Sequence, residues 1–149
     1  MKRTTLTLLT VLLISLTTIT AYAGMNMSGM DMKSGKQIML PTAVSDGVSA
    51  MAHLKDIKEA MSKMGMDATN HFMIMFTNRI SKEKMSEGTV ALKIIRPNGH
   101  TDKPIKLMSM SDAFGTDISI NDKGTYTFVV GTRLSDAKKR IFTFKYTLK

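Results

Sequence analysis

Residues 71–78, with the sequence HFMIMFTN, decide the fold that we predict for this chain. Side chains along a β-strand point alternately to opposite faces, so a strand here has two different surfaces. One face carries three large apolar side chains, those of Phe72, Ile74 and Phe76. The other carries an imidazole and two thioethers, those of His71, Met73 and Met75. The first is a core face, and the second is either more core or a metal site.

Outward from this strand, apolar residues alternate in six other segments, which are separated by turn signals such as Arg96-Pro97-Asn98-Gly99. We expect strands over 48–54, 89–95, 105–110, 116–120, 125–132 and 140–148. Residues 57–64 have helical spacing, and we expect Met61, Met64 and Met66 to pack against the sheet. We therefore predict an all-β fold, an immunoglobulin-like antiparallel β-sandwich of about seven strands with one short helix.

The first residues have the pattern of a secretory signal peptide. Lys2 and Arg3 precede an apolar stretch over 6–19, and Ala21-Tyr22-Ala23 matches a cleavage site. We expect cleavage after Ala23, a flexible Met-rich tail over 24–40 and the sandwich domain over 41–149. The expected location is the periplasm, with no stable membrane span because the apolar stretch is short and polar sequence follows it.

Composition limits the chemistry that this chain can perform. There is no Cys among the 149 residues, so neither a disulfide nor a thiolate site can form. The three His are scattered and show no zinc-motif spacing, and no Gly-rich phosphate loop is present, so we expect no enzyme. The net charge of +9 comes from dispersed Lys, as expected for solvated faces, and we expect no nucleic-acid partner.

Methionine is the unusual feature, with 15 residues. Thioethers select soft ions such as Cu(I) and need no deprotonation to bind. The polar segment after the signal peptide cannot bury apolar side chains, yet it contains Met25, Met27, Met30 and Met32. We interpret these four as ligands for Cu(I) or Ag(I), although a tail with tolerated Met would look the same.

In the predicted domain, the candidate ligands are His71 and Met73 on one strand and Met108 and Met110 on a later one. These four, together with Met75, could converge if the two strands are neighbours in the sheet, and a few such ligands satisfy Cu(I). The alternative is that Met at alternating strand positions simply packs in the core.

Two resemblances accompany these patterns. The tail, with Gly29-Met30-Asp31, resembles Met-rich segments of periplasmic copper-resistance proteins, but it lacks the His that those often contain, which favours Cu(I) or Ag(I) over Cu(II).

The domain resembles the exported YtkA-like immunoglobulin-like sandwiches and the CopC-like copper carriers. The motifs that carry this resemblance are residues 71–76, 96–99, 107–110 and 124–128. It implies an envelope protein associated with metal handling, but the N-terminal His of the CopC type is absent at Gly24.

From these observations we expect a periplasmic carrier or buffer for Cu(I) or Ag(I), with an efflux or resistance protein of the envelope as partner. The alternative is a non-catalytic structural or interaction domain of an envelope complex that uses Met for adaptable packing. Sacrificial oxidation of Met is a third interpretation, with no positional signature in the chain.

Overall fold

Ten strands and one short helix make up residues 35–149, the part of the chain that the computed structural model describes. In chain order they are β1 (Gln37–Met39), β2 (Ala43–Ser45), β3 (Val48–Asp56), α1 (Lys58–Lys63), β4 (Asn70–Asn78), β5 (Gly88–Ile95), β6 (Ile105–Lys106), β7 (Met108–Met110), β8 (Ala113–Ile118), β9 (Gly124–Leu134) and β10 (Lys139–Leu148).

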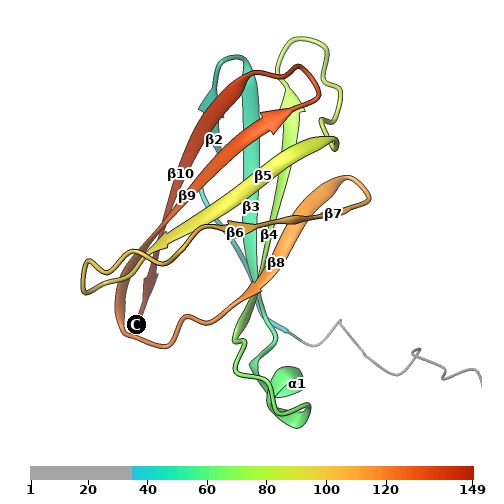
Figure 1. Cartoon of the computed structure of the whole chain (residues 1–149). Helices are drawn as coiled ribbons and strands as arrows, with labels where there is room; N and C mark the ends of the chain where they lie inside the picture. Colours follow the sequence, from blue (N-terminus) through green and yellow to red (C-terminus); the bar gives the residue numbers. More distant parts are fainter. Residues whose placement is uncertain (1–34) are drawn as a thin grey trace, which may run out of the picture. The chain divides into compact units, whose positions relative to one another are not determined.

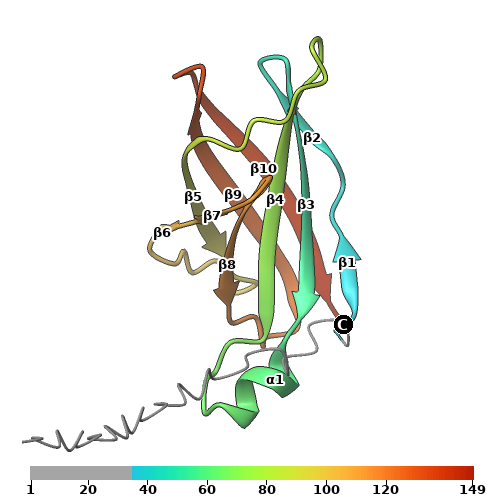
Figure 2. The same cartoon turned by 90° about the vertical axis from the view of Figure 1, so that its right-hand side faces the viewer.

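The strands form two antiparallel sheets that face each other (Figures 1 and 2). The first, which we call sheet A, has the order β1-β3-β4-β8-β7, and β2 pairs with the same edge of β3 as β1. The second, sheet B, has the order β10-β9-β5-β6. This arrangement confirms the predicted all-β antiparallel sandwich.

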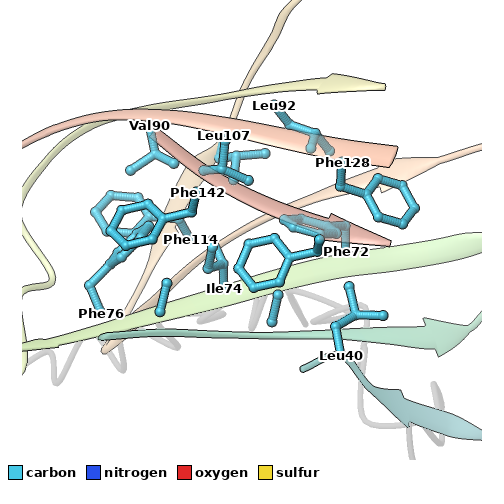
Figure 3. Packing of buried hydrophobic residues seen from close by; sticks show 14 of the residues in the cluster. Leu40, Phe72, Ile74, Phe76, Val90, Leu92, Leu107, Phe114, Phe128 and Phe142 are labelled. Atoms are coloured by element: carbon cyan, nitrogen blue, oxygen red, sulfur yellow. The ribbon is translucent and has the colours of Figure 1, made fainter. Parts of the chain in front are cut away.

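The core lies between the sheets and contains the predicted apolar face of β4. Phe72, Ile74 and Phe76 are all fully buried. The Phe72 ring lies 5.5 Å from that of Phe128 in sheet B, and the Phe76 ring lies 5.4 Å from that of Phe142, centroid to centroid (Figure 3). Burial of each such side chain stabilises the fold by about 1.5–3 kcal/mol, so β4 is a main contributor to the stability of the sandwich.

The segment 105–110, predicted as one strand, crosses from one sheet to the other. β6 pairs with β5 in sheet B, whereas β7 pairs with β8 in sheet A. Leu107, between them, is only 3% exposed, and its N–H donates a hydrogen bond to the carbonyl of Val90 (2.9 Å). Burial of this one side chain between the sheets divides the segment and delivers Met108 and Met110 to sheet A.

Sheet A also begins earlier than the boundary predicted at residue 41. β1 pairs with β3 from Gln37 onward, Ile38 packs against the core, and Leu40 is buried. Pro41 separates β1 from β2, since proline has no N–H to donate to the ladder of hydrogen bonds. The alternation of Ile38 and Leu40 explains why these residues join the sheet.

The helix prediction is correct in position but wrong in packing. α1 lies beyond the ends of β3 and β4 rather than over a sheet face (Figure 1), and it buries none of its residues. Met64 and Met66 are 41% and 50% exposed, because no strand lies beneath the apolar side of the helix. Residues 35–149 contain no helix that is long and apolar enough to cross a membrane.

A buried cation near the β9–β10 turn is held by one carboxylate. Arg140 is 4% exposed, and its Nη1 donates a hydrogen bond to Oδ1 of Asp136 (2.9 Å). The hydrogen bonds from Arg140 hold the pKa of Asp136 at about 2, below its ordinary value of 3.8. A carboxylate with a pKa lowered by folding stabilises the protein above its unfolded-state pKa, and this contribution is lost as the pH falls from 3.8 to about 2.

We predict that Asp136→Asn lowers the free energy of unfolding at neutral pH, because the buried Arg140 loses its charged partner. The difference from the wild type should shrink as the pH falls toward and below about 2, because Asp136 then becomes protonated in the folded as well as the unfolded wild type. Urea unfolding across this pH range measures it. Asp112→Asn is the matched control: Asp112 pairs with Lys84 at the surface, where an ion pair contributes little. Equal effects of the two variants would contradict the prediction.

Candidate metal site

The outer face of sheet A carries a continuous set of thioethers and imidazoles, which we call the Met/His face. On β4, the side chains that point away from the core are those of His71, Met73 and Met75, as predicted. On β3 the outward positions include Met51 and His53, which are directly opposite Met75 and Met73. The other members come from the edges of the sheet: Met39 of β1, and Met108 and Met110 of β7.

The register places one row of these residues straight across the sheet. Met39 is opposite His53, His53 is opposite Met73, Met73 is opposite Gly115, and Gly115 is opposite Met108. Directly opposite residues on one face have Cβ atoms about 4.5–5.5 Å apart. The row therefore brings together side chains that lie far apart in the sequence.

β4 and β7 are not neighbours, because β8 lies between them. The residue of β8 that faces both Met73 and Met108 is Gly115, which has no side chain to separate them. A Cβ atom at Gly115 would lie 2.7 Å from Nε2 of His71 and 2.9 Å from Sδ of Met110. The imidazole nitrogen and the thioether sulfur thus occupy the space that Gly115 leaves open.

The ring of His71 is oriented by a carboxylate. Its Nδ1 lies 2.6 Å from Oδ1 of Asp117, the residue directly opposite it on β8. A carboxylate accepts a hydrogen bond, so in the neutral ring Nδ1 carries the proton and Nε2 presents a lone pair. Nε2 is buried and has no hydrogen-bond partner among residues 35–149. A carboxylate that holds one nitrogen while the other is free is the usual arrangement of a metal-binding His.

The register brings the strand positions of all four predicted ligands of the domain close to Gly115. His71 and Met110 meet above Gly115, with Met73 on one side and Met108 on the other. Met108 and Met110, on the edge strand β7, are 71% and 41% exposed, so these two side chains are accessible from solvent. The alternative that Met at alternating strand positions packs in the core does not hold for Met108 and Met110, because both are exposed.

Sequence reasoning missed two residues of this face. Asp117 could be found only from the β4–β8 register, which pairs it with His71 across 46 residues. His53 was set aside as isolated, but Nδ1 of its ring is buried without a hydrogen-bond partner in the described part of the chain. Burial lowers the pKa of His53, helped by the charges of His71 and Lys55, which favours the neutral, ligating form of the ring.

The donor set points to a soft ion. No group of three or more His, Cys, Asp or Glu side chains among residues 35–149 could hold a metal ion. The Met/His face instead offers imidazoles and thioethers, which suit Cu(I) better than the oxygen-preferring cations. Met25, Met27, Met30 and Met32, like the signal peptide, lie outside the described residues and stay predictions.

Comparison with known proteins adds little to this description. No model of a known protein family matches the chain, and no curated protein matches it. Among solved structures, the chain is similar to the crystal structure of the PmoD soluble domain from Methylocystis sp. ATCC 49242 (Rockwell). The identity is 13% and the TM-score 0.47, over 72% of this chain and 97% of that one. A similarity this distant transfers no function, and membership of the YtkA-like or CopC-like families stays a prediction.

We predict that Asp117→Ala changes the tautomer of His71, because the variant lacks the acceptor that keeps the proton on Nδ1. More of the rings should then carry the proton on Nε2, and ¹⁵N chemical shifts of the His rings measure this change. His100, in an exposed turn, provides an internal reference that should not move. An unchanged His71 spectrum would show that Asp117 does not set the tautomer.

Proposed function

We propose that this protein binds Cu(I) or Ag(I) in the periplasm and acts as a carrier or buffer in metal homeostasis or resistance. The observation that carries the proposal is the meeting of His71 Nε2 and Met110 Sδ above Gly115. Met73 and Met108 would complete the ligand set from either side. The lone pair of Nε2, buried and without a partner among the described residues, fits an ion better than it fits a packing role.

The charges around the site favour a monovalent ion. Lys55 is directly opposite His71, so its ammonium group repels any cation bound there. This repulsion is half as large for a singly charged ion as for a doubly charged one at the same distance. Asp117, on the other side of His71, offsets part of it. Neutral thioethers suit such an ion, since Cu(I) and Ag(I) need soft donors more than they need negative charge.

A carrier must also release its ion, and the location of the site allows this. Two of the proposed ligands, Met108 and Met110, belong to an edge strand of three residues that are all exposed. A partner could replace these thioethers one at a time, which would transfer the ion by ligand exchange. We propose an efflux or resistance protein of the envelope as that partner. The tail residues Met25, Met27, Met30 and Met32 would supply further ligands for capture.

The alternative function is adaptable protein recognition. Met39, Met51 and Met108 are 52%, 43% and 71% exposed on the Met/His face, and flexible thioethers suit a surface that must fit a partner. An interaction domain would need neither the free Nε2 of His71 nor the open space at Gly115. Metal titration therefore separates the two functions.

For the mature protein, we predict tight uptake of Cu(I) in an anaerobic competition titration against a chromogenic chelator. His71→Gln and Met110→Leu should each weaken the domain site, because each removes one of the donors that meet at Gly115. Asp117→Ala should weaken it by about 10- to 100-fold, as loss of a carboxylate that orients a ligating His does elsewhere. Gly115→Ala should act in the same direction by pushing the two donors apart.

Two matched variants control for the general effect of removing a Met or a His. Met66→Leu and His100→Gln change exposed residues outside the Met/His face and should leave the affinity unchanged. If the wild type takes up no Cu(I) even against a weak chelator, the proposal fails and the interaction function becomes the better account.

The role of the tail has a separate test. Deletion of residues 24–33 should lower the number of Cu(I) ions bound per protein while the domain site remains, because the tail carries its own four thioethers. The same titration, together with native mass spectrometry, counts the ions. A stoichiometry unchanged by the deletion would remove the tail from the proposal.

A further inference from the structure

The proposed site leaves one buried nitrogen of the Met/His face without a role. Nδ1 of His53 is buried and, like Nε2 of His71, has no hydrogen-bond partner among residues 35–149. A buried polar atom without a partner costs free energy, so such atoms call for an explanation. His53 projects from the middle of β3, where strands on both sides hold its backbone in place.

Two thioethers flank His53 directly. Met39 of β1 and Met73 of β4 are its opposite neighbours in the sheet, with Cβ atoms about 4.5–5.5 Å away on the same face. Met39 is 52% exposed, and its Sδ accepts a long hydrogen bond from Nε2 of Gln37 (3.5 Å). That contact is weak and leaves the sulfur open to a ligand. One imidazole between two thioethers is a soft donor set in its own right.

From this arrangement we infer that His53, Met39 and Met73 form a second site for a soft monovalent ion, beside the one at His71 and Met110. The inference rests on the proposed function, because it assumes that this face binds such ions. Met73 lies between the two sets, opposite His53 on one side and Gly115 on the other. It is the residue through which an ion would pass from one set to the other.

The groups around His53 set the order of filling. Lys55 follows it on β3, and both Lys55 and His71 act electrostatically on its ring. Within residues 35–149 no carboxylate is paired with His53, whereas Asp117 orients His71. The second site therefore binds a soft ion more weakly than the first site and fills after it. Both Lys55 and the ion already bound at the first site repel an ion at the second site.

Nitrogen chemical shifts of the His rings test this inference on the whole mature protein. The chain has only three His, so each ring nitrogen can be followed during titration with Ag(I). We expect Nε2 of His71 to shift first and Nδ1 of His53 to shift as more Ag(I) is added, while His100 stays unchanged. In His71→Gln, Nδ1 of His53 should still shift. Met39→Leu should raise the Ag(I) concentration required at His53 and leave that at His71 unaltered.

The outcomes separate this inference from the proposed function. If His71 shifts and Nδ1 of His53 does not, even with excess Ag(I), the proposed function stands and the second site is overturned. If both rings shift together in the wild type and neither shifts in a folded His71→Gln variant, the two His belong to one site, and the inference is also overturned. If neither ring shifts in the wild type, both the inference and the proposed domain site fail.

Discussion

The pairing register between β3 and β4 is the constraint on which the rest of this structure depends. A slip of one residue in either strand would move its whole inner face to the solvent side. Burial of Phe72, Ile74 and Phe76 against the aromatic rings of sheet B makes such a slip costly. The same register keeps His53 opposite Met73 on the outer face. The core therefore determines the geometry of the Met/His face.

Gly115 has a corresponding role on the other side of β4. Any side chain there would stand between Met73 and Met108 and would collide with the ring of His71. Because Gly115 has no side chain, His71 of β4 and Met110 of β7 can both approach the space above it. Asp117, two residues further along β8, orients the His71 ring. One strand thus supplies both the open space and the carboxylate that make the arrangement suitable for an ion.

The position of the Met/His face at the edge of the fold matters for what it could do. The chain crosses between the sheets at Leu107. Met108 and Met110 therefore lie on the short edge strand β7 and not in the interior. Thioethers on a short, exposed edge strand are easier for a protein partner to reach than buried ones. Such a partner could replace them as ligands of a bound ion. For the proposed metal site, this location would favour transfer over permanent storage.

The sequence by itself determined the all-β class, the longer strands and the two-faced character of β4, because alternation and turn chemistry are local properties. It did not predict β1 and β2 or the division of 105–110 into two strands. It also indicated His71, Met73, Met108 and Met110 as candidate donors from their types alone. Only the tertiary structure decided that these positions lie together around Gly115, since strand order and register depend on contacts between distant segments. The roles of Gly115, Asp117 and His53 emerged there for the same reason: nothing in their local sequence distinguishes them, and their neighbours across the sheet define what they do.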